Sequence, residues 1–111
     1  MNATNTDAGA EVTVARGNLY LTREICDTYL PGVASVALLA RDGDVLIVPL
    51  IQLSAGGLLL KQRNARGDRV IHAQEFFRNA GLPEEFEPRT MPVHWSRDSA
   101  ALVVAGFKPI C

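Results

Sequence analysis

The sequence predicts a mainly β fold with two short helices (α+β), in which two tandem β-α-ββ units share one barrel-like core. Three observations lead to this prediction: short β-rich runs bounded by turn residues, two brief helical segments, and the same order of elements in both halves. The chain has 111 residues, 48% of them hydrophobic, which is enough for a single compact domain. This apolar fraction and the net charge of −1 exclude an intrinsically disordered protein.

The chain begins with a polar segment, residues 1–10, which we expect to be a disordered tail. The first unit is expected over residues 11–53. Alternating apolar residues predict a strand over 11–15, and a turn at 16–18 leads into a short extended piece at 19–21. The unit therefore opens with two short extended segments on either side of a turn.

A short helix with one apolar face is expected next. Thr22 is a suitable N-cap because its hydroxyl can accept a hydrogen bond from a free backbone N–H, and Glu24 lies near the positive end of the helix. Pro31 and Gly32 are expected to end the helix. The apolar residues recur at helical spacing and define the inward face: Ile25, Cys26, Tyr29 and Leu30.

Two apolar runs, residues 33–40 and 45–51, complete the first unit as a hairpin. The Asp42-Gly43 pair between them is a hairpin-turn signal. Because both runs are almost continuously apolar, we expect each strand to be covered on both sides. Pro49 places its part of the second strand at an edge or an end of the sheet.

The second unit is expected over residues 58–107, after a flexible linker at 54–57. Its elements follow the order of the first unit. They are a strand over 57–62, a polar turn at 63–67, an extended piece at 69–71, a helix at 73–80, an acidic loop at 82–90, and strands at 92–95 and 100–107.

The two halves align over their turns. Residues 16–18 fall on residues 66–68, and residues 41–42 fall on residues 97–98 after a short insertion in the acidic loop. A unit of about 45 residues buries too little surface to be stable alone, so two units are expected to share one core.

This arrangement resembles the AbrB/MraZ-like swapped-hairpin β-barrel superfamily. Residues 16–25 (RGNLYLTREI) resemble the family's segment from the first turn into the helix, and residues 42–49 (DGDVLIVP) resemble its closing strand. Two units in one chain resemble the MraZ arrangement, in which the halves pair within a protomer. The resemblance implies a small DNA-binding transcriptional regulator that contacts duplex DNA through the turn after the first strand of a unit.

The candidate binding site is the segment 61–69, which holds the local excess of basic residues. Lys61 and Arg63 alternate along an expected strand and therefore share a face. Arginine suits bidentate contact with phosphate and with guanine edges in a major groove. The resemblance adds basic residues of the first unit, so the predicted nucleic-acid-binding set is Lys61, Arg63, Arg66, Arg69, Arg16 and Arg23.

Only the second half carries this basic segment, so symmetric contact with a palindromic site requires a homodimer. The same segment also fits a solvated loop that protects a sheet edge from pairing. The net charge of −1, and the order Arg16-Gly17 where the family has Gly-Arg, support an alternative function. In this alternative the chain is an accessory or adaptor protein-interaction module that keeps the fold without binding DNA.

The sequence contains no pattern that predicts an enzyme, a metal site or a cofactor. His72 and His94 are the only histidines, and neither has a cysteine or carboxylate beside it at metal-binding spacing. Cys26 lies on the apolar helix face, where a core position is favoured over a nucleophile. Two cysteines, no visible signal peptide and no run of about 20 apolar residues predict a cytoplasmic protein without membrane contact.

Overall fold

The computed structural model describes residues 10–51, 57–82 and 87–107, and these residues form a mainly β fold with two short helices. The predicted fold class is confirmed at this level. The predicted tail at residues 1–10 and linker at 54–57 lie almost entirely outside the described residues. Within the described part of the chain, neither helix has the length and apolar character needed to cross a membrane.

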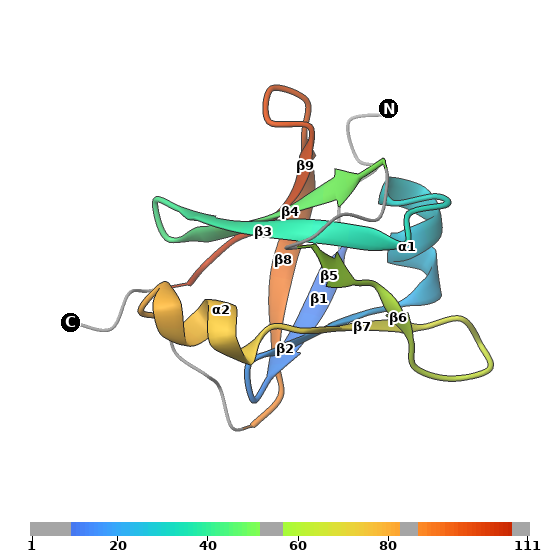
Figure 1. The fold of residues 1–111 in the computed structure, drawn as a ribbon, viewed down its shortest axis with the longest axis horizontal. Helices are drawn as coiled ribbons and strands as arrows, with labels where there is room; N and C mark the ends of the chain where they lie inside the picture. The colour runs from blue at the N-terminus through green and yellow to red at the C-terminus, as the bar shows by residue number, and fades with distance from the viewer. Residues whose placement is uncertain (1–9, 52–56, 83–86, 108–111) are drawn as a thin grey trace.

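Each half of the chain contains one short helix with strands before and after it. The first half contains β1 (Glu11–Ala15), β2 (Asn18–Leu21), α1 (Arg23–Tyr29), β3 (Ser35–Arg41) and β4 (Asp44–Leu50). The second half contains β5 (Leu58–Leu59), β6 (Lys61–Gln62), β7 (Arg69–His72), α2 (Gln74–Asn79), β8 (Arg89–Ser96) and β9 (Ala101–Val104). The helices lie toward opposite ends of the molecule (Figure 1).

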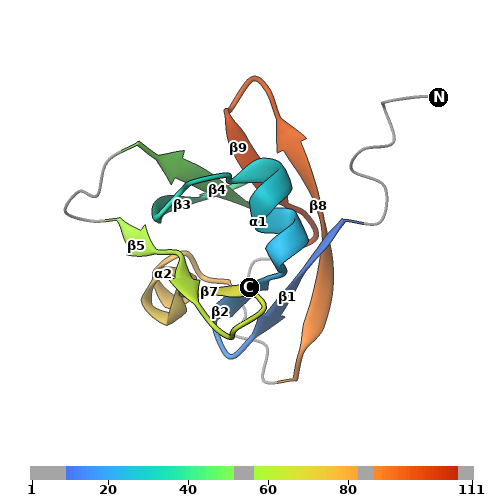
Figure 2. The same ribbon diagram turned by 90° about the vertical axis from the view of Figure 1, so that its right-hand side faces the viewer.

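The described strands form one antiparallel sheet in which the two halves are interleaved. The strand order is β5-β3-β4-β9-β8-β1-β2-β7-β6, and the sheet curves into a nearly closed barrel (Figure 2). The β1–β2 hairpin and the β3–β4 hairpin belong to the same half but do not pair with each other. Instead, the β3–β4 hairpin lies between β5 and β9, and the β1–β2 hairpin lies between β8 and β7.

The two ends of this sheet belong to one short segment, residues 58–62, which closes the barrel. β5 pairs with β3 and β6 pairs with β7, while a single residue, Leu60, separates β5 from β6. The backbone N–H of Leu60 donates a hydrogen bond to the carbonyl of Ala34 at 2.9 Å. The Leu60 side chain is 4% exposed and packs in the core. The chain therefore leaves one end of the sheet and joins the other by bending around one buried residue.

A single main core contains side chains from both halves. Phe77 of α2 is fully buried and packs edge-on against Phe76 and Phe107, with ring centroids 5.8 and 5.5 Å apart. Because inward-facing residues alternate along the strands, each hairpin contributes part of the same apolar interior. Its other large, fully buried side chains include Leu19, Leu21, Ile47, Ile71, Met91 and Leu102.

Several local predictions are confirmed. The Thr22 hydroxyl accepts a hydrogen bond from the N–H of Ile25 at 3.3 Å and caps α1 as expected. The β3–β4 turn contains Asp42 and Gly43, whose positive φ angles of 53° and 83° suit a two-residue hairpin. Pro49 lies at the end of β4, beyond the residues that pair with β9.

Two predictions are wrong. β8 begins at Arg89, inside the segment predicted as a loop, because β1 offers a partner edge and pairs Val14 with Arg89 and Thr13 with Thr90. β3 is not covered on both sides, since Leu39 is 53% exposed toward the tip of its hairpin. An apolar run in the sequence indicates a strand but does not identify what packs on each of its faces.

The closing residue can be tested with two adjacent leucines. We expect Leu60→Ala to lower the free energy of unfolding by about 2–5 kcal/mol, because it leaves a cavity where the sheet closes. Leu59 lies beside it and is 57% exposed, so Leu59→Ala should change stability by about 0.5 kcal/mol at most. Urea unfolding followed by circular dichroism measures both values, and equal losses would contradict this role for Leu60.

Candidate nucleic-acid interface

The site is built on the outer face of the sheet where the two halves meet. Tyr20 of β2 lies between Leu19 and Leu21, whose side chains are buried in the core, so strand alternation turns Tyr20 outward. Tyr20 is directly opposite Thr13 on β1 and Val70 on β7. An aromatic ring therefore occupies the outer face at the pairing between the first and second halves.

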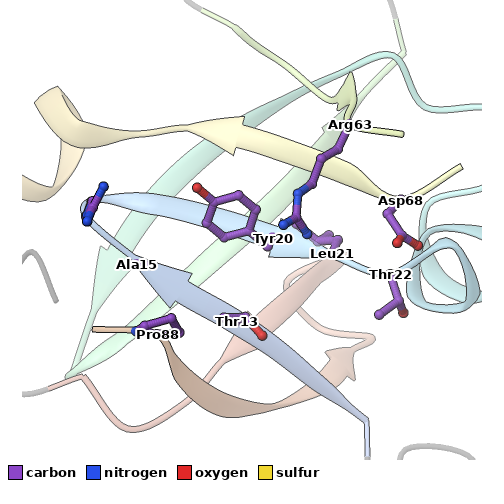
Figure 3. A pocket seen from close by; sticks show the side chains of 9 residues that line it. Thr13, Ala15, Tyr20, Leu21, Thr22, Arg63, Asp68 and Pro88 are labelled. Carbon is purple, nitrogen blue, oxygen red and sulfur yellow. The ribbon is translucent and has the colours of Figure 1, made fainter. Parts of the chain in front are cut away.

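A hollow of about 470 Å³ opens beside this ring, and we call it the tyrosine hollow. The guanidinium carbon of Arg63 lies 4.7 Å from the centre of the Tyr20 ring. Figure 3 shows the Arg63 side chain reaching toward Tyr20, with Thr13 and Pro88 below the ring in this view. Arg16 also lines the hollow. The remaining lining residues are Ala15, Leu21 and Thr22.

Arg16 lies in the tight β1–β2 turn. Ala15 pairs with Asn18, and the two residues between them, Arg16 and Gly17, have positive φ angles of 54° and 76°. This is the left-handed geometry that two-residue hairpins require, and glycine adopts it without the Cβ clash that other residues incur. The short turn leaves Arg16 little backbone freedom and holds it at the rim of the tyrosine hollow.

The loop between β6 and β7, residues 63–68, is held by its own hydrogen bonds, and we call it the basic loop. The Asn64 side-chain oxygen accepts from the backbone N–H groups of Arg66 and Asp68, at 3.1 and 3.2 Å. The Gln62 amide donates to the Asn64 carbonyl at 2.8 Å. The N–H of Arg63 donates to the Asp68 carbonyl at 2.7 Å. The loop therefore presents its arginines from an ordered backbone.

Asp68 joins the basic loop to the start of α1. Its carboxylate accepts from the backbone N–H of Arg23 at 2.9 Å and from the Asn64 side-chain amide at 3.0 Å. The Arg66 guanidinium lies 3.3 Å away from the same carboxylate. These hydrogen bonds, from Asn64 first and Arg23 second, hold the pKa of Asp68 below its ordinary value, and the positive charge of Arg66 acts in the same direction.

The loop approaches α1 closely, and a glycine makes this approach possible. Gly67 has a φ of 98°, and a Cβ at this position would lie 3.3 Å from the side chain of Arg23. A second hollow of about 300 Å³ adjoins the tyrosine hollow, because both are lined by Thr22 and Asp68. The other residues that line this second hollow are Arg23, Glu24 and Arg66.

Four of the six predicted site residues therefore gather along two adjoining hollows, and we call this set the basic band: Arg16, Arg63, Arg66 and Arg23. Lys61 lies opposite Val70, in the same cross-strand row as Tyr20, so it projects from the same face without lining either hollow. The predicted shared face of Lys61 and Arg63 agrees with this placement.

Arg69 is the exception. It lies opposite Leu21, whose side chain is in the core, so it projects from the inner face of the sheet, away from Tyr20. One of its guanidinium nitrogens donates to the Leu60 carbonyl at 3.5 Å. Arg69 also lines a cavity with Cys26 of α1. Arg69 is therefore close to Arg63 and Arg66 in the sequence but does not lie with them in the structure.

Cys26 occupies the core position expected from the helical stripe. Burial raises the pKa of its thiol to about 11, although the positive charge of Arg69 opposes this shift. The thiol is therefore protonated at neutral pH, which disfavours nucleophilic chemistry. In the described part of the chain, no group of three or more histidine, cysteine, aspartate or glutamate side chains is arranged to hold a metal ion.

Sequence reasoning missed the residue at the centre of the site. Tyr20 alternates with two leucines, and this spacing already places its ring on the face opposite the core. The Asn18 amide donates to the Tyr20 hydroxyl at 3.4 Å, and the other side-chain atom of Asn18, Oδ1, is buried without a hydrogen-bond partner. The alternation signal was therefore present, but the partners of Tyr20 depend on long-range strand pairing.

Comparisons with known proteins add no assignment to this geometry. No family model matches the chain, and no curated protein and no solved structure is significantly similar to it. The function is therefore argued from the basic band, the two hollows and the fold that positions them.

The link between Asp68 and α1 predicts a specific pH dependence. Because the folded state lowers the pKa of Asp68, its carboxylate contributes stability above its unfolded pKa, about 3.9, and loses that contribution as pH falls through the lower folded value. Asp68→Asn keeps the shape without the charge. We expect this variant to be less stable than the native chain at pH 6.

The stability difference between the two proteins should narrow as pH falls from 4 toward 2.5, which urea unfolding at several pH values measures. A difference that stays constant over this range would show that the charge of Asp68 does not stabilise the folded state.

Proposed function

We propose that this chain is a small, non-catalytic DNA-binding regulator of AbrB/MraZ-like type that contacts duplex DNA as a homodimer. The observation that carries the proposal is the basic band, in which Arg16 and Arg23 of the first half lie along the same two hollows as Arg63 and Arg66 of the second. Clustered guanidinium groups on one face are the electrostatic signature of phosphate binding, even in a chain with a net charge of −1.

The strand pairing supports the resemblance to swapped-hairpin barrels and the tandem arrangement. Hairpins of one half pair only with strands of the other, as interleaved units require. The β2–β7 register is symmetric about Tyr20 and Val70: Leu19 pairs with Ile71 on one side, and Leu21 with Arg69 on the other. Sequence alignment of the two turns also places residue 20 on residue 70. Two related units around a pseudo-twofold axis account for both facts.

The basic loop is the element proposed to enter the DNA. A two-stranded ribbon fits the major groove, and arginine pairs there with guanine edges or with the flanking phosphates. The hydrogen bonds of Asn64 and Asp68 order the loop before it binds, so less conformational entropy is lost on association. Since only the second half carries this loop, two protomers provide the pair of contacts that a palindromic site needs.

A second candidate function is supported by exposed apolar side chains outside the basic band. Leu39, Ile51 and Leu59 are large apolar residues with exposed fractions of 53%, 101% and 57%. Apolar side chains that reach solvent are available to pack against another protein, and contiguous patches of them mark such contacts. These residues are the basis for the alternative, an adaptor or accessory module that keeps the barrel and does not bind DNA.

Salt-dependent DNA binding tests the first function. We expect the native protein to bind duplex DNA more weakly as salt increases, because phosphate contacts release counterions. The double variant Arg63→Ala/Arg66→Ala should lower the slope of log affinity against log salt by about 2, since each lost phosphate contact removes about 1. Gel-shift titrations at several salt concentrations measure both slopes, and light scattering measures the oligomeric state.

The matched control removes the same charge elsewhere. Arg78 lies in α2 and Arg97 in the β8–β9 turn, both far from the basic loop (Figure 1). Arg78→Ala/Arg97→Ala should keep the native slope. No retention of any duplex at low salt contradicts the DNA-binding function, and recovery of a discrete protein partner in that case favours the adaptor.

A further inference from the structure

We propose that the tyrosine hollow binds a single nucleotide unit with an unpaired base, which stacks on the guanidinium of Arg63 while its phosphate pairs with Arg16. This inference deepens the proposed function, on which it rests for the class of ligand. The same chemistry is offered by a free mononucleotide and by one nucleotide of a single strand, and the experiment below separates these sources.

The stacking step follows from the geometry of Arg63 and Tyr20. Their separation of 4.7 Å places a flat cation against a flat ring, and Arg63 also lines the open hollow. Nucleobases stack on tyrosine rings and on guanidinium planes. Inside a duplex both faces of a base are already stacked, so this platform selects a base that has left the helix or was never paired.

The position of Tyr20 is well defined before any ligand arrives. Its backbone is paired on both sides, with Thr13 and Val70, and its hydroxyl is near the Asn18 amide. Asn18 is 8% exposed, and its buried Oδ1 still lacks a partner. A ring held in this way loses little conformational freedom on binding, which favours affinity.

The size and lining of the hollow also fit one nucleotide. A volume of about 470 Å³ lies within the range of about 300–1,000 Å³ found for small-molecule sites. Pro88 and Ala15 offer apolar contact for a base edge and sugar. Thr13 and Thr22 offer hydroxyl groups for hydrogen bonds. This combination of apolar walls and a few polar groups is typical of sites that bind an aromatic, charged ligand.

Charge within the hollow directs the phosphate. Asp68 is the acidic residue of the lining, but its carboxylate is already engaged by Asn64, the N–H of Arg23 and Arg66. Arg16 contributes a guanidinium from the β1–β2 turn, and its planar group can bind phosphate oxygens in pairs. An anionic group is therefore expected beside Arg16, away from Asp68.

The basic band provides a route for the rest of a single strand. The second hollow adjoins the first through Thr22 and Asp68 and is lined by Arg66 and Arg23, whose guanidinium groups lie 3.3 Å from the carboxylates of Asp68 and Asp27. A stacked base at one end and backbone contacts along a basic groove are the two parts of single-strand binding sites. In this arrangement the platform of Arg63 on Tyr20 selects unpaired bases. Arg66 contacts only phosphate, so it does not distinguish a single strand from a duplex.

The inference can be tested by measuring fluorescence anisotropy of a labelled single-stranded pentanucleotide and of a labelled duplex, with AMP as an unlabelled competitor. We expect Tyr20→Leu to weaken single-strand binding about tenfold, because it removes the ring that holds the Arg63 guanidinium in place for stacking on a base. Tyr20→Phe should keep native affinity, since it keeps the ring. Arg63→Lys keeps the positive charge but lacks the planar guanidinium, so it should also lower the single-strand affinity about tenfold.

Arg16→Asn tests the phosphate contact, because asparagine tolerates the positive φ at this turn position. It should lower the affinity for both AMP and the single strand. Arg97→Ala, at a distant turn, should leave both affinities unchanged. Competition by AMP identifies a free nucleotide as a ligand, and binding of the oligonucleotide alone identifies a strand. Circular dichroism melting verifies that each variant is folded.

The outcomes separate this inference from the proposed function. Equal single-strand affinities for the native protein, Tyr20→Leu and Arg63→Lys would overturn the inference, even if duplex binding persists. No duplex binding combined with a ring-dependent single-strand or AMP signal would overturn the regulator function and keep the inference. Failure of AMP and the single strand to bind the native protein at low salt would also overturn the inference.

Discussion

Closure of the sheet by the segment around Leu60 is the constraint on which the rest of the structure depends. A curved sheet with two free edges would expose unpaired backbone groups and leave its interior open to water. Residues 58–62 cover part of both edges together, because they pair with β3 at one end and with β7 at the other. The same segment leads directly into the basic loop. Barrel closure and presentation of that loop are therefore produced by consecutive residues.

The site arises from strand pairing between halves, and alternation along the strands then sorts its charges. The β2–β7 pairing brings Tyr20 of the first half beside Arg63 of the second, and alternation sends Arg69 to the opposite face. Asp68 adds a second connection, because it caps the first N–H of α1 from a loop of the other half. Electrostatics at the site therefore depend on long-range backbone geometry more than on the number of basic residues.

Sequence patterns predicted the local elements well because those elements depend on near neighbours. The Thr22 cap, the Asp42-Gly43 turn and the inward stripe of α1 all rest on residues within one or two turns of chain. The start of β8 and the exposure of Leu39 depend instead on which strands meet. For the same reason, the basic segment was recognisable from composition, whereas its division between two faces and its contact with Tyr20 required the pairing register.

The interleaving of the hairpins has a consequence for how the chain acquires its structure. β1 cannot gain its second neighbour until β8 is available, and β4 cannot gain its own until β9 is available. During synthesis, the strands of a nascent first half would therefore keep unpaired edges until β8 and β9 have emerged. High contact order of this kind slows folding and lengthens exposure to aggregation. The topology that gathers distant arginines thus makes the fold dependent on rapid completion of the β8–β9 hairpin.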